Sequence, residues 1–196
     1  MTLPNQLTLS RFVLTALFLI VIFAAFNGNE TLALVLFCIA GFTDFLDGRI
    51  ARKQNLITNF GTLMDPLADK ILTCSAFIAF VELHQMEAWM VVIIVARELA
   101  ITGLRLLAAT KHVVLAAERY GKHKTISQII AIITVLVLLS YPQWGSLGMT
   151  LFGGMIGGRP WIEHFAGFSK WVAVVLTLSS GAVYVWRNRR LYLDDM

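Results

Sequence analysis

Residues 42–70, FTDFLDGRIARKQNLITNFGTLMDPLADK, join two apolar runs of the chain and carry four aspartates. The flanking runs are long enough to cross a bilayer, so the stretch predicts two membrane helices joined by a polar turn. Carboxylates are costly at membrane depth and are rare there unless they serve a function. The stretch therefore predicts a functional site near the membrane surface.

The composition of the whole chain indicates a polytopic membrane protein. Of its 196 residues, 58% are hydrophobic and only 14% are charged, whereas soluble domains contain roughly 45 to 50% apolar residues. About 20 apolar residues suffice to cross a hydrocarbon core of roughly 30 Å. We expect an all-α fold, one transmembrane domain over residues 1–196, with six spans near 8–27, 31–52, 62–81, 86–109, 124–141 and 167–187.

The first apolar run could instead be a secretory signal, because it follows a single basic residue, Arg11, and ends in small residues. Its amphipathic beginning, MTLPNQLTLSR, is unlike the compact basic region of such a signal. We therefore predict a retained membrane helix.

Lysine and arginine predict the orientation in the membrane. With a cytoplasmic N-terminus, the inner connections fall near 49–61 and 110–123, and of 16 Lys and Arg residues only Arg159 and Lys170 lie outside. This satisfies the positive-inside rule and places the aspartates at the cytoplasmic face of a bacterial-type inner membrane. The formal charge of +4 is explained by topology and by anionic membrane lipids, so we expect no nucleic-acid partner.

The aspartates have the spacing of side chains that share a helix face. Asp44 and Asp47 are three residues apart, and Asp65 and Asp69 are four apart. A short turn would bring the pairs face to face, where four carboxylates cannot all stay ionised without cations between them. Oxygen ligands without His or Cys favour Mg²⁺, Mn²⁺ or Ca²⁺ over zinc. Room for two ions predicts a phosphoryl-transfer centre.

Small residues and an arginine beside the aspartates predict a cleft for a large phosphorylated ligand. Gly48 and Gly61 remove side chains where a ligand must approach the backbone. Ala51 extends this cleft, and Arg52 supplies a planar fork that matches a diphosphate. A helix-contacting polar residue or an ion relay explains a single aspartate well, but not this combination.

The same residues resemble the signature of a known family. Residues 44–69, DFLDGRIARKQNLITNFGTLMDPLAD, match the pattern DxxDGxxARx8GxxxDxxxD of the CDP-alcohol phosphatidyltransferases at every position. The resemblance spans the chain and implies six transmembrane helices in a homodimer. The stretches PNQLTLSR, MDPLADKIL, ARELAITGLR and GKHKT are similar to the branch that makes phosphatidylglycerophosphate.

The resemblance also implies a reaction. Family members transfer the phosphatidyl group of CDP-diacylglycerol to an alcohol, release CMP and require Mg²⁺ or Mn²⁺. The branch resemblance implies glycerol 3-phosphate as acceptor, while serine, inositol phosphate and phosphatidylglycerol stay open because the signature is shared. The implied metal ligands are Asp44, Asp47, Asp65 and Asp69, with Asp69 also the catalytic base, and the implied CDP-diacylglycerol contacts are Asp44, Gly48, Ala51, Arg52 and Gly61.

The phosphate of the acceptor needs cations placed away from the metals. Arg97 and Arg105 are eight residues apart, which places them within about 80° of each other on a helix. Lys122 and Lys124 begin the fifth predicted helix, where amide dipoles also favour an anion. Arg11 lies at a similar depth on the first. We expect these five residues to bind the acceptor phosphate, unless they only set topology or contact lipid headgroups.

Two further alternatives stay open. Arg97 lies deep enough to pair with Glu98 or with an aspartate instead of a phosphate. The aspartates could also serve a cation or proton transporter, although the sequence has neither the inverted repeats nor the broken helices typical of transporters.

Overall fold

The computed structural model describes residues 3–54, 59–110 and 120–189. Within these ranges, only the backbone is described at residues 3–8, 44–54, 59–69, 109–110 and 120–122. The described chain is almost entirely helical. Its long helices are α1 (Leu3–Ile22), α2 (Asn29–Gln54), α3 (Asn59–Glu82), α4 (Ala88–Thr110), α5 (Tyr120–Ser140) and α7 (Trp161–Arg187).

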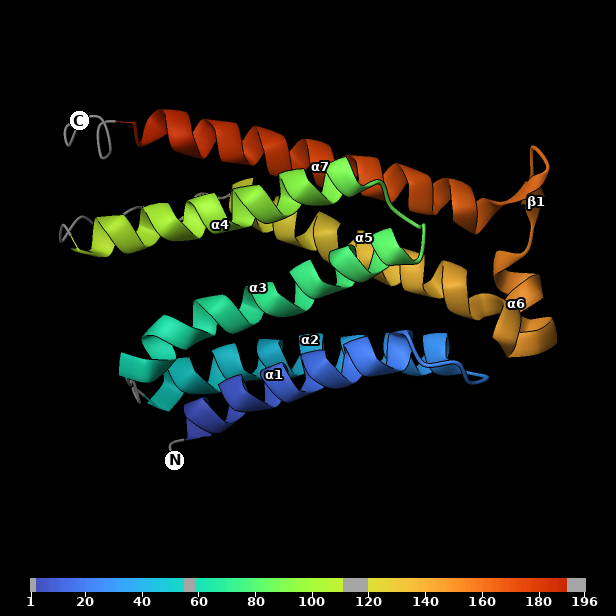
Figure 1. Ribbon diagram of the computed structural model, residues 1–196, viewed down its shortest axis with the longest axis horizontal. Coiled ribbons are helices and arrows are strands. Elements are labelled where there is room, and N and C mark those ends of the chain that lie inside the picture. The colour runs from blue at the N-terminus through green and yellow to red at the C-terminus, as the bar shows by residue number, and fades with distance from the viewer. Residues whose placement is uncertain (1–2, 55–58, 111–119, 190–196) are drawn as a thin grey trace.

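The long helices pack into an elongated bundle (Figure 1). Helix α1 contacts α2 and α3, α5 contacts α2 and α7, and α4 contacts α3 and α7. At one end of the bundle, here named the inner end, α1 begins and α7 ends, and α2 and α4 also end there (Figure 1). The opposite, outer end carries η1 (Tyr141–Trp144), α6 (Gly145–Phe152) and a hairpin of β1 (Met155–Ile156) and β2 (Arg159–Pro160).

Aromatic and small apolar side chains fill the interior of the bundle. The rings of Phe18 and Phe37 join α1 to α2 with their centroids 6.0 Å apart, and Phe77 meets Phe80 edge-on within α3. Alanines such as Ala76, which is fully buried, allow the helix backbones to approach closely. The core therefore extends along the bundle and joins its successive helices.

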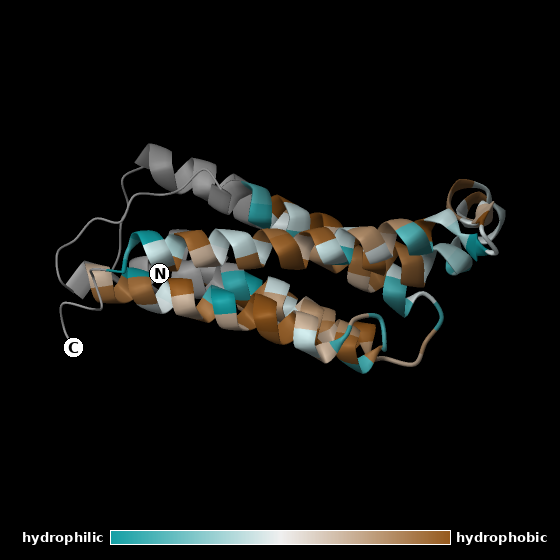
Figure 2. Cartoon of the chain, turned by 90° about the horizontal axis from the view of Figure 1, so that it is seen from above, coloured by the Kyte–Doolittle hydropathy of each residue, from teal (hydrophilic) through white to brown (hydrophobic). Residues whose placement is uncertain are grey.

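Hydrophobic side chains also cover the outside of the bundle. Ile20, Val92, Phe168 and Trp186 are between 64% and 71% exposed, and hydrophobic residues recur along the coloured parts of the long helices (Figure 2). Soluble proteins rarely expose so much contiguous apolar surface. The described residues include two segments with the length and composition of membrane spans, His123–Phe152 and Trp161–Arg187. These features indicate a membrane protein.

Each of the six predicted spans coincides with a long helix, but several helix limits differ. Helix α1 ends at Ile22 rather than at residue 27, and α7 begins at Trp161 rather than at residue 167. The backbone N–H of Trp161 bonds to the carbonyl of Gly154 at 2.8 Å and anchors this earlier start to the hairpin region. Helices α2 and α3 extend into the connection predicted near 49–61, so the signature is helical at 44–54 and 59–69.

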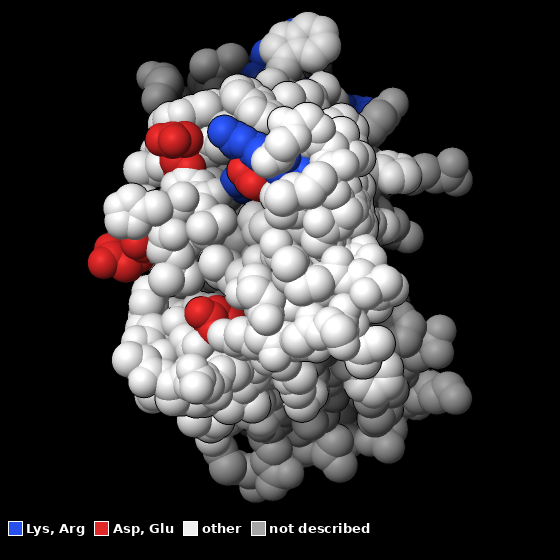
Figure 3. All heavy atoms as spheres, turned by 90° about the vertical axis from the view of Figure 1, so that its right-hand side faces the viewer, with Lys and Arg blue, Asp and Glu red and all other residues white. Residues whose placement is uncertain are grey.

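The outer end of the bundle carries few charges. Seen from that end, most of the surface is uncharged, with one main basic area, further basic atoms at the rim and a few separate acidic areas (Figure 3). Trp144 and Trp161 flank Phe152 there, with ring centroids 5.7 Å and 5.9 Å from that of Phe152. Aromatic residues of this kind are typical of the membrane interface.

Candidate active site

The four aspartates of the signature lie toward the inner ends of two consecutive helices. Asp44 and Asp47 fall within α2, and Asp65 and Asp69 fall within α3. Both helices are continuous through these positions, so spacings of three and four residues place each pair on one helix face. The side chains of the signature residues predicted to form the site lie outside the described residues: Asp44, Asp47, Gly48, Ala51, Arg52, Gly61, Asp65 and Asp69.

A cavity of about 230 Å³ lies next to these positions. Its wall reaches Gly41, less than one helical turn before Asp44, and Lys70, which directly follows Asp69. A cavity of this size suits a small polar molecule better than a drug-sized one. Four helices, α1, α2, α3 and α5, contribute its lining of Arg11, Phe37, Ala40, Gly41, Lys70, Leu72, Thr73, Thr125, Gln128 and Ile129.

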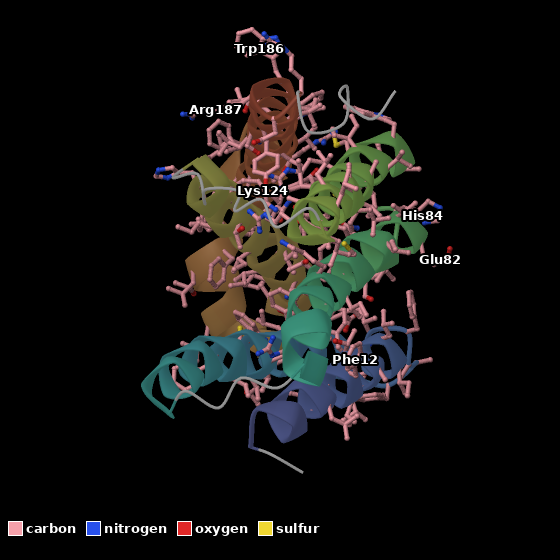
Figure 4. The ribbon with its side chains drawn as sticks, turned by 90° about the vertical axis from the view of Figure 1, so that its left-hand side faces the viewer. Phe12, Glu82, His84, Lys124, Trp186 and Arg187 are labelled. Atoms are coloured by element: carbon pink, nitrogen blue, oxygen red, sulfur yellow. The ribbon has the colours of Figure 1, made fainter. Side chains whose placement is uncertain are left out.

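Beside this cavity, a buried carboxylate gathers three cations. Glu98 of α4 is only 2% exposed. Its Oε2 lies 2.7 Å from Nζ of Lys70, its Oε1 lies 3.4 Å from Nη1 of Arg97, and Nζ of Lys124 also contacts Oε1. Lys124 is likewise 2% exposed, and it lies between the helices when the bundle is seen from the inner end (Figure 4). Buried charges of opposite sign in contact offset part of each other's desolvation cost.

Hydrogen bonds extend this group to the last helix. The Gln128 amide donates to Oε1 of Glu98 at 3.3 Å and to Oγ1 of Thr177 at 3.0 Å. Nη2 of Arg97 donates to Oγ of Ser180 at 3.3 Å. The network therefore joins α3, α4, α5 and α7. We name its central members the Glu98 cluster: Glu98, Lys70, Arg97, Lys124 and Gln128.

The Glu98 cluster and the cavity share part of a wall. Lys70 and Gln128 line the cavity and also contact Glu98. Lys124 lies one helical turn before Gln128 on α5. A ligand in the cavity would thus meet amine and amide groups whose positions are set by the buried carboxylate.

The structure brings three of the predicted phosphate-binding cations to this region. Arg11 is buried and lines the cavity. Arg97 and Lys124 lie in the Glu98 cluster, so the alternative that Arg97 pairs with Glu98 is confirmed.

The other two predicted cations have different surroundings. Arg105 is exposed, and its guanidinium carbon lies 5.7 Å from the centre of the Tyr184 ring on α7. Lys122 belongs to α5, but its side chain lies outside the described residues. Positions two apart differ by about 200° around a helix, so Lys122 and Lys124 lie on nearly opposite faces of α5.

Three members of the site were not predicted as such: Glu98, Lys70 and Gln128. Glu98 was considered only as a partner of Arg97, although two adjacent opposite charges inside an apolar run are unusual. The contacts themselves join residues that are far apart in the chain, 26 residues for Lys124 to Glu98 and 30 for Gln128 to Glu98. Helix packing, which the sequence pattern did not specify, brings them together.

The described side chains contain no group of three or more His, Cys, Asp or Glu residues that could hold a metal ion. The side chains of the signature aspartates lie outside the described residues. On the backbone, Asp44 and Asp47 share one face of α2, and Asp65 and Asp69 share one face of α3, toward the same end of the bundle. Donors of this kind suit hard divalent ions.

Comparison with known proteins agrees with the family resemblance of the signature. The family model described as CDP-alcohol phosphatidyltransferase matches residues 1–179. The chain belongs to this family. A CDP-diacylglycerol–glycerol-3-phosphate 3-phosphatidyltransferase of Bacillus subtilis is 39% identical, over 95% of this chain and 94% of its own length. Proteins of the same name from Rickettsia typhi and Salmonella typhimurium are each 32% identical, over 93% and 98% of this chain and 94% and 97% of their own lengths.

Proposed function

We propose that this protein transfers the phosphatidyl group of CDP-diacylglycerol to glycerol 3-phosphate, which yields phosphatidylglycerophosphate and CMP for phospholipid biosynthesis. The observation that carries this proposal is the likeness, at 32–39% identity over nearly the whole chain, to proteins named for this reaction. A cavity with cationic walls beside the signature helices suits the anionic acceptor.

The proposed reaction moves one phosphorus centre from one oxygen to another. A hydroxyl oxygen of glycerol 3-phosphate bonds to the phosphorus that carries the diacylglycerol. The bond from this phosphorus to the bridging oxygen breaks, and CMP leaves with that oxygen and with the bonding electrons. The hydroxyl proton passes to the Asp69 carboxylate. Because such transfers involve spread negative charge, positioning and charge stabilisation supply most of the catalysis.

The signature residues have two proposed roles. Some hold the lipid substrate, and others act on the reacting oxygen atoms. In the proposal, Asp69 is the base, and Gly48, Ala51, Arg52 and Gly61, together with Asp44, hold the cytidine diphosphate part. Two Mg²⁺ or Mn²⁺ ions, when bound, would neutralise diphosphate charge and stabilise the entering and leaving oxygens. Their proposed ligands are Asp44, Asp47, Asp65 and Asp69.

The acceptor phosphate is assigned to the cavity and its cations. Arg11 lines the cavity directly, and Arg97 and Lys124 belong to the adjoining Glu98 cluster. Arg105 and Lys122 are retained as proposed contacts. In the proposal they contact the acceptor at the inner rim of the cavity. This fits their positions in the chain, because Arg105 lies toward the inner end of α4 and Lys122 toward that of α5.

The wider context is proposed on the same grounds. The six long helices of the described residues, with the start of α1 and the end of α7 at the same inner end, support six transmembrane spans in one domain over residues 1–196. The sparse basic surface at the outer end supports a cytoplasmic active site (Figure 3). Bacterial relatives support a bacterial inner membrane, and a homodimer surrounded by membrane lipids is proposed from the family resemblance.

CMP release by the purified protein tests the proposal. With CDP-diacylglycerol and Mg²⁺, we expect CMP only when glycerol 3-phosphate is added, not with serine, inositol phosphate or phosphatidylglycerol. A chelator should stop the release, and Mg²⁺ or Mn²⁺ should restore it.

Two results would overturn this proposal. CMP release with serine but not with glycerol 3-phosphate would assign the chain to another branch of the family. Ion flux into liposomes without CMP release under any acceptor would favour a transporter.

A further inference from the structure

The Glu98 cluster carries more positive than negative charge. One carboxylate, Glu98, faces the cations of Lys70, Arg97 and Lys124, so these four side chains together have an excess of two positive charges. Excess charge is unfavourable in a poorly hydrated interior unless a counter-charge offsets it. A phosphate monoester, which carries up to two negative charges near neutral pH, has the matching charge.

Glu98 also leaves its lysine partners able to bind a second anion. An ammonium group has three N–H donors. Contact with one carboxylate oxygen uses one of them, so Lys70 and Lys124 each keep donors for another ligand. Lys70 and Gln128 already face the cavity. The carboxylate therefore sets the direction of these groups without exhausting them.

A glycine on the facing helix makes room for the third cation. A Cβ atom added to Gly181 of α7 would lie 2.8 Å from Cγ and 3.6 Å from Nε of Arg97. The first distance is too short for a real Cβ contact, and Cγ belongs to the inner part of the side chain, which cannot simply swing aside. Only glycine at this position lets Arg97 run along α7 to Glu98 and Ser180.

We infer that Glu98 is a positioning residue that holds Lys70, Arg97 and Lys124 in the arrangement that receives the phosphate of the acceptor, and that Gly181 supplies the space this arrangement needs. The inference rests on the proposed function and names the groups that would select a phosphorylated acceptor over an uncharged alcohol. Glu98 and Gly181 act through the cations and do not touch the reacting atoms.

The first test replaces the carboxylate. In Glu98→Gln the cations lose their counter-charge and repel one another. Part of the free energy of acceptor binding is then used to bring them together. We expect the KM for glycerol 3-phosphate to rise by about 30-fold or more, while the KM for CDP-diacylglycerol changes less than about threefold. Glu98→Asp, which keeps the charge, should recover part of the loss. Glu82→Gln, on an exposed residue of α3, is the matched control and should behave as wild type.

The second test changes only the space around Arg97. Gly181→Ala should raise the KM for glycerol 3-phosphate about tenfold, through the displaced arginine. Gly167→Ala is the control on the same helix, because an added Cβ there meets no atom within 4 Å. In an Arg97→Ala background, where the side chain ends before Cγ, Gly181→Ala should have no further effect.

The outcomes separate this inference from the proposed function. If wild-type protein neither releases CMP with glycerol 3-phosphate nor binds it in calorimetry, the proposed function fails. If wild type does both, and folded Glu98→Gln and Gly181→Ala keep a wild-type KM, the positioning inference alone is overturned. Equal increases in both KM values, or a Gly181→Ala effect that persists in the Arg97→Ala background, also overturn it. Where Glu98→Gln does not fold, the Gly181 series decides.

Discussion

A cavity near each end of the bundle has charged lining residues, yet the two regions hold charge in different ways. The outer cavity, lined in part by His84, Glu163 and Lys170, has a volume of about 450 Å³, larger than the inner one of about 230 Å³. Its neighbouring ion pair, Arg159 with Glu163 at 2.9 Å, is local in the chain, and the two side chains are 68% and 41% exposed.

At the inner end, by contrast, one buried carboxylate meets cations from three helices. An exposed pair contributes up to about 1 kcal/mol, whereas breaking a buried pair by removing one partner costs about 3 to 5 kcal/mol. Of these two cavities, the smaller one lies beside the signature helices. Buried charge drawn from distant parts of the chain distinguishes it from the larger one.

The largest effect is expected at the proposed base. Asp69→Asn removes the carboxylate that takes the hydroxyl proton, so CMP release should fall by at least about 100-fold. The rate of CMP release at saturating substrates measures this. Glu163→Gln, the matching change at the outer end, should retain the wild-type rate. A near-normal rate in Asp69→Asn would contradict the role of Asp69 as the base, and the two ends would then not differ in catalysis.

A second contrast concerns lysines at the two ends. Lys124→Ala removes a buried cation beside the acceptor cavity, so the KM for glycerol 3-phosphate should rise about 10- to 100-fold, with little change for CDP-diacylglycerol. Lys170→Ala, at the outer cavity, should leave both KM values unchanged. Equal effects of Lys124→Ala on the two substrates would count against a role in acceptor binding.

A third contrast concerns two glutamines. Gln128→Leu removes the buried amide that donates to both Glu98 and Thr177, so the free energy of unfolding should fall by about 1 to 3 kcal/mol. Gln143, at the outer end, forms hydrogen bonds with Glu30 and Thr31 in an exposed position. Gln143→Leu should therefore lower the free energy of unfolding by less than Gln128→Leu does. Denaturant or thermal unfolding in one detergent compares the two. The reverse order would mean that the outer contacts stabilise the bundle more.

The smallest effect is expected for the exposed ion pair. Arg159→Ala should change the free energy of unfolding by less than about 1 kcal/mol, because solvent and salt screen the pair. CMP release should be unaffected. A larger loss of stability, especially one that persists in high salt, would show that this end of the molecule depends on its charges after all.

The positions of the long helices could be predicted from the sequence because the relevant signal is local. Runs of apolar residues located the six long helices of the described chain, since a sustained apolar run of about 20 residues is a local property of the sequence. The limits were less accurate where the signal weakens. The start of α7 was placed at residue 167 rather than at Trp161, because the stretch before residue 167 contains several glycines and the charged residues Arg159 and Glu163 and so is not a continuous apolar run.

The site was predictable only in part, for a physical reason. A signature such as residues 44–69 is local, and its spacing alone indicates shared helix faces. The Glu98 cluster depends instead on which helices become neighbours, and Lys124 and Gln128 meet Glu98 only because α4 and α5 converge on α7. A sequence can show that Lys124 lies at the start of a helix, but not that a carboxylate from another helix faces it.

The order of the Glu98 cluster along the chain has a consequence for biogenesis. Helices enter the bilayer in chain order, so α4, which carries Glu98, reaches it before α5, which carries Lys124. A lone charge at the centre of an inserting helix costs about 2.5 to 3.5 kcal/mol. Because Arg97 is its immediate neighbour and Lys70 lies on the preceding helix, Glu98 has a cationic partner from the moment of insertion. The fifth helix then adds Lys124 to the cluster. The translocon therefore never has to accommodate Glu98 as an unpaired anion.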